Sequence, residues 1–262
     1  MRRIIIFLTL TLALLGMIHL NQMAQSWHYV VPAEDDELLY ATSFDGAADD
    51  WLQDERGTFS HIVDDGVLRI IANVGGVAPY SVVQPHFDRF DFSVQAQIIE
   101  GDFAGGNNNA FGIIFRRASP RDYYVLLISG DGYYRVLREA DGTSREISTW
   151  HPSDAIRQEA GAVNHLRVVG VADRFAFYVN DTRLPLCIPD DPDGASTINS
   201  FTGECVAGTW QETLTDAHHP SGQLGVVVSA DSAGRPPGGQ PVIVEFDNAI
   251  ITGASDFTED TP

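Results

Sequence analysis

One stretch of sequence decides the fold: AFGIIFRR (residues 110–117), DYYVLLIS (122–129), GYYRVLRE (132–139), NHLRVVGVAD (164–173) and RFAFYVND (174–181). Each segment is rich in Val, Ile, Phe and Tyr, and each is bounded by Gly, Pro, Asn or Asp. Short apolar segments closed by turn-forming residues are typical of antiparallel sandwiches and barrels. We therefore predict an all-β fold, a two-sheet antiparallel β-sandwich.

The flanking sequence continues this pattern on both sides. Residues 59–63 and 67–74 predict a hairpin, because Asp65-Gly66 in the turn between them favours the positive φ that such turns need. Residues 90–99 alternate apolar and polar side chains, as one half-buried strand does. The segments QLGVVVSA (223–230) and PVIVEFDNAIITG (241–253) predict the last two strands.

The chain has 262 residues, 44% hydrophobic and 20% charged, which suffices for one all-β domain with a sizeable core. Pro152-Ser153-Asp154 predicts one short helical turn, and residues 186–222 are expected to be irregular. We expect a leader at 1–24, an acidic linker at 25–37, the sandwich at 38–253 and a disordered acidic tail at 254–262.

The first 24 residues have the order of a secretory signal, because Arg2 and Arg3 precede an uncharged run from Ile4 to Leu20. Cleavage after Ala24 is favoured, although Gln22 stands where a small residue is usual. Retention as a membrane anchor is the alternative, and a run of 17 residues is short for a span of roughly 30 Å. Either way we expect an extracytoplasmic protein, secreted or tethered by its N-terminus.

The net charge of −20 limits the partners, and the part after residue 24 carries −22 because the leader contains two arginines and no acid. Binding to nucleic acid and to anionic lipid depends on cationic attraction to phosphate. We therefore expect no nucleic-acid partner, and membrane contact only through the N-terminal segment.

The only two cysteines, Cys187 and Cys205, are 18 residues apart in a turn-rich segment. In an exported protein they are expected to form a disulfide, with two free thiols as the alternative. The chain-entropy model gives roughly 3 kcal/mol for closing a loop of this size.

Several segments resemble those of a known family and follow one another along the chain in the family's order: GIIFRR, DYYVLLIS, GDGYYRVLRE, NHLRVVGVADRFAFYVND, GQLGVVVSA and VEFDNAII. They resemble the concanavalin A-like jelly-roll domains of exported bacterial proteins, in particular laminin-G-like, family-16-glucanase-like and 3-keto-disaccharide hydrolase-like sandwiches. The resemblance covers residues 38–253 and implies a jelly-roll fold. Sugar binding is common in this superfamily.

The same resemblance argues against family-16 hydrolysis, because the E-x-D-x-x-E strand motif of those glucanases is absent from this chain. The sequence also contains no G-x-S-x-G nucleophile elbow. We assign no catalytic residues, and enzymatic activity is the less favoured hypothesis for this protein. The alternatives that stay open are a glycoside hydrolase of the 3-keto-disaccharide hydrolase type and a structural adhesion domain.

The candidate ligand-binding residues come from the tyrosine pairs of the hairpin 122–139 and from the asparagine-rich loop before it. An exposed tyrosine can stack on a sugar ring while an arginine binds hydroxyl groups. The alternative is that both pairs pack in the core, and Trp150 and Trp210 are further candidates. We select Arg116, Tyr124, Tyr134, Arg135, Asn107, Asn108 and Asn109.

No cofactor is required by this reading, and a structural calcium ion is possible. The resemblance implies a calcium site where the terminal strands meet, with Asp45 and Asp247 as its candidate ligands. We predict that the acidic turn at 190–194 is a surface loop, because it lacks the ligand spacing of a calcium loop. We predict the same for the pair His218-His219, because no third zinc ligand accompanies it at a suitable spacing.

Together these features predict an exported, non-catalytic carbohydrate-binding or cell-surface interaction module. The expected partner is a glycan or a cell-surface polysaccharide.

Overall fold

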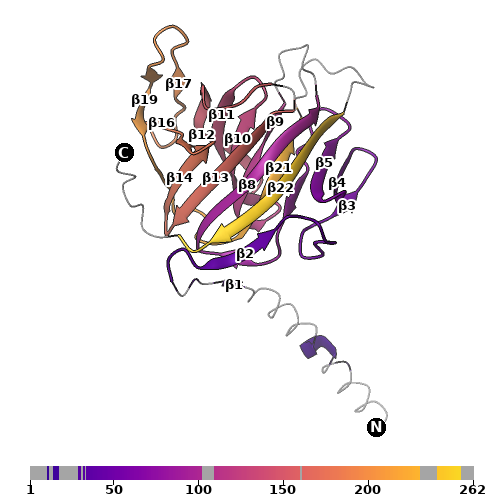
Figure 1. The fold of residues 1–262 in the computed structure, drawn as a ribbon. Coiled ribbons are helices and arrows are strands. Elements are labelled where there is room, and N and C mark those ends of the chain that lie inside the picture. Colours follow the sequence, from indigo (N-terminus) through magenta and orange to yellow (C-terminus); the bar gives the residue numbers. More distant parts are fainter. Residues whose placement is uncertain are drawn as a thin grey trace.

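The structure is a computed structural model that describes residues 34–101, 109–159, 161–230 and 241–254, together with residues 11, 14–17, 29–30 and 32. Nearly all of the regular elements in the described parts are strands, arranged in two packed layers (Figure 1). Within these ranges, no helix is long and apolar enough to cross a membrane. Most of the predicted leader and of the predicted tail lies outside the described residues.

One layer is a six-stranded antiparallel sheet in the order β12-β11-β10-β9-β21-β6. Its strands are β6 (Tyr80–Val82), β9 (Ala110–Ser119), β10 (Asp122–Ser129), β11 (Tyr133–Ala140), β12 (Thr143–Pro152) and β21 (Gln223–Ser229). Three of the five segments that predicted the fold become its central strands β9, β10 and β11.

The other layer is a ten-stranded antiparallel sheet whose main path is β15-β14-β13-β8-β22-β5-β4-β3, with β2 joined to β22 and β20 joined to β14. Its strands are β2 (Leu38–Thr42), β3 (Asp54–Glu55), β4 (Phe59–Asp64), β5 (Val67–Ala72), β8 (Arg89–Glu100), β13 (Val163–Val171), β14 (Arg174–Val179), β15 (Thr182–Arg183), β20 (Leu214–Thr215) and β22 (Val242–Thr252). The predicted two-sheet antiparallel sandwich is confirmed.

The core lies between the two layers and is built by alternation along each strand. On β8 the side chains of Phe90, Phe92, Val94, Ala96 and Ile98 are buried, and the residues between them are more exposed. Because successive side chains of a strand point to opposite faces, this alternation places one row of apolar groups toward the opposite sheet.

Aromatic rings fill the centre of this core. Phe115 of β9 lies 5.2 Å from Phe175 and 5.8 Å from Phe177 of β14 between ring centroids. Pairs at this spacing contribute beyond their buried area. These contacts join the two sheets across the middle of the sandwich.

The predicted hairpin is confirmed, because β4 and β5 pair from Phe59 to Ala72 around a turn at Asp65 and Gly66. Both turn residues have positive φ, 51° for Asp65 and 78° for Gly66. This is the backbone that a two-residue hairpin turn needs to match the twist of its strands.

Two local expectations were wrong. The segment 186–222 is not irregular, because it forms β16 (Leu186–Pro189) paired with β19 (Gly208–Gln211) and β17 (Thr197–Ile198) paired with β18 (Cys205–Val206). The segment after Pro152 is a hydrogen-bonded turn with Ile156 N donating to Ser153 O at 3.2 Å, not a helical turn. The predicted disulfide between Cys187 and Cys205 is present and crosses the first of these regions.

The remaining pair joins the N-terminal segment to the sandwich. β1 (Tyr29–Val30), within the expected linker, pairs in parallel with β7 (His86–Phe87). Phe87 in turn exchanges backbone hydrogen bonds with Gly222, which directly precedes β21 of the six-stranded sheet. The chain therefore enters the fold beside the end of the six-stranded sheet that carries Gly222.

Candidate functional site

The tyrosine pairs of the β10–β11 hairpin divide between the two faces of the six-stranded sheet. Tyr124 pairs with Phe115 on β9, and Tyr134 pairs with Ile128 on β10, so both follow the buried rows. Tyr124 and Tyr134 are 0% and 1% exposed, whereas Tyr133 is 39% exposed. The expectation that Tyr124 and Tyr134 present their rings to a ligand is therefore wrong, since it is Tyr123 and Tyr133 that face outward.

Tyr124 has a structural environment in the core. Its ring stacks on Phe115 at 5.2 Å, and its hydroxyl donates to Asp216 Oδ1 at 2.8 Å. The other oxygen of Asp216 accepts from Arg138 Nη1 at 2.6 Å. Burial, followed by the hydrogen bond to Asp216, raises the pKa of the Tyr124 hydroxyl. The network fastens the loop at residue 216 to the inner face of the sheet.

Tyr134 plays a similar part on the next strand. Its hydroxyl donates to Pro185 O at 2.5 Å, and its ring meets the edge of His151 at 5.3 Å. Burial is the main cause that raises the pKa of this hydroxyl. Trp210, the second tryptophan candidate, also packs on His151, with 4.6 Å between ring centroids, and is 36% exposed.

Arg116 is fully buried, so the expectation that it reaches a ligand at the surface was also wrong. It has φ 52° at an irregularity of β9, and its guanidinium lies against the rings of Phe90 and Phe175. Nη2 donates to the carbonyl oxygens of Asp88 and Ala172, at 2.8 Å for Ala172. Burial lowers the pKa of Arg116 to about 10. The side chain ties turns of the other sheet to β9.

The asparagine loop is described only at its last residue. Asn109 is buried, and its carbonyl oxygen accepts from Gly130 N at 3.2 Å. Asn107 and Asn108 lie outside the described residues.

Arg135, the remaining candidate, lines a hollow of about 400 Å³ on the outer face of the six-stranded sheet. We call this the Trp150 hollow. It is lined by Ala110, Ser129, Asp131, Tyr133, Arg135, Trp150 and Ser229. The structure thus brings together Arg135 and Trp150, which the sequence singled out, with Tyr133, the member of its tyrosine pair that was not selected, and with Asp131, which was not a candidate.

The Trp150 hollow exists because small side chains lie in one row of the sheet. Ser129 of β10 pairs with Ala110 of β9, and Ala110 pairs with Ser229 of β21. Outward-facing neighbours on adjacent strands are close together, so three small groups leave a depression. Tyr133 and Trp150 are the large aromatic groups at its side.

Arg135 is held against the aromatic wall. Its guanidinium carbon lies 4.5 Å from the centre of the Trp150 ring, within the range of a cation–π contact. Its Nη1 is 3.7 Å from Glu146 Oε2 on the neighbouring strand β12. The contacts with Trp150 and Glu146 therefore restrict the motion of the guanidinium at the hollow.

Asp131 is fixed by the turn between β10 and β11. Ser129 Oγ donates a short hydrogen bond to Asp131 Oδ1 and accepts from Tyr133 N at 3.1 Å. Gly132, with φ 91°, permits this turn. These bonds fix the Asp131 carboxylate in a defined position at the Trp150 hollow.

The predicted calcium ligands come near one another in the ten-stranded sheet, beside the part of β22 that lies between its pairing with β5 and its pairing with β2. A Cβ at Gly66 would lie 3.2 Å from Asp45 Oδ1, and β5 next to this turn pairs with β22 at Leu68–Phe246, one residue before Asp247. Asp45 accepts from Ser43 Oγ at 2.7 Å, and Asp247 accepts from Asn248 N. Among the described residues, no group of three or more His, Cys, Asp or Glu is arranged to hold a metal ion. Calcium binding at Asp45 and Asp247 stays a prediction.

His219 of the histidine pair is buried rather than exposed in a loop. Its Nε2 lies 2.8 Å from Glu139 O, and its ring meets Tyr124 edge-on at 5.0 Å. Burial lowers its pKa. The side chain packs as part of the core beside the Asp216 network.

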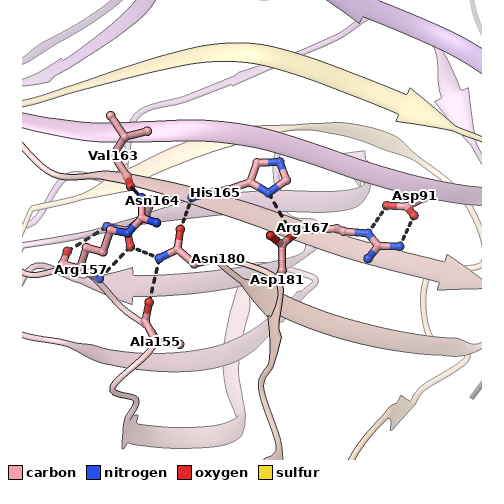
Figure 2. A network of polar contacts seen from close by, with 9 residues as sticks. All are labelled: Asp91, Ala155, Arg157, Val163, Asn164, His165, Arg167, Asn180 and Asp181. Carbon is pink, nitrogen blue, oxygen red and sulfur yellow. Dashed lines mark hydrogen bonds and ion pairs between the residues drawn. The ribbon is translucent and has the colours of Figure 1, made fainter. Parts of the chain in front are cut away.

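A second polar cluster lies on the ten-stranded sheet (Figure 2). Asn180, with φ 48°, donates to Ala155 O at 2.7 Å and to Asn164 Oδ1 at 2.8 Å, and it accepts from His165 N at 2.9 Å. Arg167 makes two hydrogen bonds to Asp91, at 2.8 and 2.6 Å. Figure 2 shows these groups hydrogen-bonded to one another along β13. Because Asn180 follows β14, its bonds hold the β14–β15 turn against the start of β13 rather than form an open site.

Comparison with solved structures identifies the fold. A Bacillus subtilis protein of unknown function with a galectin-like fold is 11% identical, with a TM-score of 0.52 over 85% of this chain and 99% of that one. The catalytic domain of an endo-1,3-β-glucanase (laminarinase) from Thermotoga petrophila RKU-1 is 11% identical, with a TM-score of 0.52 over 86% and 100%. A Bacteroides ovatus mixed-linkage glucan GH16 protein is 8% identical, with a TM-score of 0.53 over 82% and 100%.

The likeness to these structures shows that the chain has the concanavalin A-like jelly-roll fold that the sequence predicted. No family model matches the chain, and no curated protein matches it.

Proposed function

We propose that this protein is an exported glycan-binding module and that the Trp150 hollow is its binding site. The observation that carries the proposal is the composition of the hollow, in which Trp150 and Tyr133 stand beside Arg135 and Asp131 over a floor of small residues. Sugar rings have apolar faces that stack on aromatic side chains and hydroxyl groups that pair with charged groups. The fold supports the proposal, since it is shared with proteins whose names describe action on glucans.

The expected affinity is modest. The Trp150 hollow is open, so a bound sugar exchanges well-solvated hydroxyl groups for a small number of contacts. Dissociation constants from millimolar to micromolar, roughly −4 to −8 kcal/mol, are the consequence. The Trp150 ring packs on the outward apolar cluster and against Arg135, and a ring that is already fixed reduces the entropy lost on binding.

Binding without catalysis is favoured by the chemistry of the described lining. Its one carboxylate, Asp131, is engaged by Ser129, whereas glycoside hydrolysis usually employs two carboxyl groups on either side of the bond. The observation that favours the alternative, a hydrolase, is Glu146, whose carboxylate flanks Arg135 at 3.7 Å.

The test is a glycan-array screen of the purified protein, with and without EDTA, followed by titration of each hit with Tyr133→Ala and Trp150→Ala. Both variants are expected to weaken binding about two- to tenfold, because one stacked aromatic pair contributes about 0.5–1.5 kcal/mol. Phe201→Ala is the matched control, because Phe201 is 98% exposed and lies outside the Trp150 hollow. Tyr133→Ala is expected to stay folded because the Tyr133 side chain is already partly exposed, so weaker binding by this variant would not reflect misfolding.

The outcomes separate the function classes. Binding that Tyr133→Ala and Trp150→Ala leave unchanged would place the site elsewhere and overturn the proposal. Release of sugars from a hit, abolished by Glu146→Gln or Asp131→Asn, would establish the hydrolase instead. Loss of binding in EDTA, restored by calcium, would support the ion predicted at Asp45 and Asp247.

The location that fits this function is outside the cytoplasm. The disulfide between Cys187 and Cys205 is the bond expected of an exported protein. The net charge of −20 keeps such a protein soluble and disfavours nucleic acid as a partner.

A further inference from the structure

A second hollow lies on the same sheet as the Trp150 hollow. It measures about 570 Å³ and is lined by Asp49, Trp51, Leu52, Gln53, Val82, Gln84, Arg117 and Gln223. We call it the Gln223 hollow. Several of its side chains carry amides or a guanidinium, the groups that form hydrogen bonds with sugar hydroxyls.

The Gln223 hollow is built from a linked set of side chains. Arg117 Nη1 donates to Gln223 Oε1 at 2.5 Å, and Arg117 Nη2 donates to Tyr80 Oη at 3.0 Å. The Arg117 guanidinium carbon also lies 5.0 Å from the centre of the Tyr80 ring. Gln223 Nε2 donates to the carbonyl oxygens of Val83 and Gln84, at 3.1 and 3.2 Å. This arrangement fixes the polar rim.

Both hollows are formed by the same two central strands. β9 contributes Ala110 to the Trp150 hollow and Arg117 to the Gln223 hollow, and β21 contributes Ser229 and Gln223 respectively. Six residues separate the two positions on β21, which corresponds to about 20 Å at roughly 3.3 Å per residue. A single sugar unit cannot occupy both hollows, whereas a chain of sugars can.

The surface between the hollows is apolar and aromatic. Tyr80 of β6 and Tyr123 of β10 approach to 6.4 Å between ring centroids, although β9 and β21 lie between their strands. The two rings pack on the outward cluster that contains Ile114, Val125 and Val227. They supply stacking surface on the way from one hollow to the other.

Two glycines leave the outer face of the six-stranded sheet without side chains at two central positions. A Cβ at Gly112 of β9 would lie 1.9 Å from Leu126 O, and one at Gly225 of β21 would lie 2.1 Å from Ser81 O. Only glycine fits such close backbone approaches. The centre of the sheet therefore carries no side chain at these two positions.

The charges of the two hollows favour an uncharged ligand. Each contains one carboxylate and one guanidinium, Asp131 with Arg135 and Asp49 with Arg117. The protein around them has a net charge of −20. A polyanionic chain would be repelled by this field.

From these observations we infer that the ligand is an uncharged polysaccharide chain that lies along β9 and β21 and occupies both hollows at once. This inference rests on the proposed glycan-binding function. It adds the ligand class, a chain rather than a terminal sugar, and a second binding region centred on Arg117, Gln223 and Gln84.

The experiment measures affinity by calorimetry along oligosaccharide ladders, from the monosaccharide to the hexasaccharide, of β-glucan, xylan, mannan and α-glucan. We expect one ladder to bind, with the hexasaccharide at least about tenfold tighter than the disaccharide, because the second hollow is engaged intramolecularly. Gln84→Ala and Arg117→Met are expected to weaken hexasaccharide binding about three- to tenfold, the value of one hydrogen bond, and to leave disaccharide binding unchanged.

Trp150→Ala is the matched comparison, because it should weaken the short and the long oligosaccharide alike. If short and long members of a ladder bind equally and Trp150→Ala weakens both, the glycan-binding function stands and the chain inference is overturned. A gain with length that neither Gln84→Ala nor Arg117→Met reduces also overturns it. Tighter binding of oligogalacturonate, an anionic ladder, contradicts the uncharged class. Failure of every ladder, with no hit on the array, ends both proposals.

Discussion

Tyr124 illustrates how a side chain that looks suited to binding is used for stability. Its hydroxyl is buried and donates to Asp216, which is itself paired with Arg138. A buried acceptor that loses its donor keeps the cost of desolvation. The contribution of Tyr124 is therefore to the free energy of unfolding and not to a surface site.

Removing that hydroxyl is expected to be destabilising. Tyr124→Phe should lower the free energy of unfolding by about 1–3 kcal/mol, because Asp216 loses a buried hydrogen bond. Tyr133→Phe, on an exposed residue of the same hairpin, should change it by less than about 0.5 kcal/mol. Urea unfolding of the two variants measures the difference, and equal stabilities would show that the Asp216 network contributes little.

The sequence predicts in part which tyrosine of each pair faces outward. Adjacent residues of a strand point to opposite faces, so Tyr134 and Arg135 cannot share a binding face, whereas Tyr133 and Arg135 can. In GYYRVLRE the polar Arg135 therefore indicates that Tyr133 faces outward. DYYVLLIS gives no such signal, because both of its faces are apolar, and only the pairing of Tyr124 with Phe115 resolves it.

At the scale of elements, the β4–β5 hairpin depends on the backbone of its turn. Gly66 has φ 78°, and a Cβ there would approach Asp45 Oδ1 to 3.2 Å. Gly66→Ala should therefore destabilise the protein by about 1 kcal/mol or more. Gly57→Ala is the control, because a Cβ at Gly57 meets nothing within 4 Å and its φ is not positive. Thermal unfolding distinguishes the variants, and a loss for Gly57→Ala as large as that for Gly66→Ala would contradict the argument.

The paired strands β16–β19 and β17–β18 are elements that the sequence did not predict. Their strands are only two to four residues long, so alternation cannot reveal them. They are held by contacts distant in sequence, such as Cys187 N donating to Ser148 Oγ at 3.1 Å. The two cysteines were the available signal that this segment is ordered.

Replacing both Cys187 and Cys205 by serine is expected to lower the free energy of unfolding by roughly 3 kcal/mol, because the unfolded chain regains the entropy of the closed loop. Calorimetry of the variant, beside the natural protein with and without a reducing agent, measures this. The reduced natural protein should match the variant. An unchanged melting temperature in both would show that the bond is dispensable.

For the whole molecule, buried histidines link stability to pH. Burial lowers the pKa of His61, His151 and His219 from the ordinary value of about 6.5. The unfolded chain binds protons at these groups before the folded protein does, so their stabilising contribution is complete above pH about 6.5 and is lost as the pH falls through the lowered values.

The free energy of unfolding should therefore decrease as the pH falls from about 7.5 to 5, where the carboxyl groups of unfolded chains are still mostly ionised. His61→Gln should reduce the slope of this decrease. His218→Gln is the matched control at a histidine of the exposed loop. Urea unfolding at a series of pH values measures the slopes, and a slope unaffected by His61→Gln would exclude that residue as a source.

The whole fold was accessible from the sequence because long alternating strands such as β8 carry their own signal. The proposed binding surface was predictable from the sequence only in part, because it depends on which residues of β9, β10 and β21 become neighbours. Ala110, Ser129 and Ser229 lie far apart in sequence and have no distinguishing chemistry. Their register across three strands, and not their identity, creates the Trp150 hollow.

The parallel pairing of β1 with β7 has a consequence for how the protein is oriented. Phe87 of β7 bonds to Gly222, and Asp36 N donates to Gly253 O, so the chain enters and leaves the sandwich at the end near the Gln223 hollow. A support attached at that end, whether a membrane, a neighbouring domain or a sensor chip, would leave the Trp150 hollow pointing outward. A polysaccharide bound along β9 and β21 would then extend away from the support, and its distal end would be accessible to a second protein.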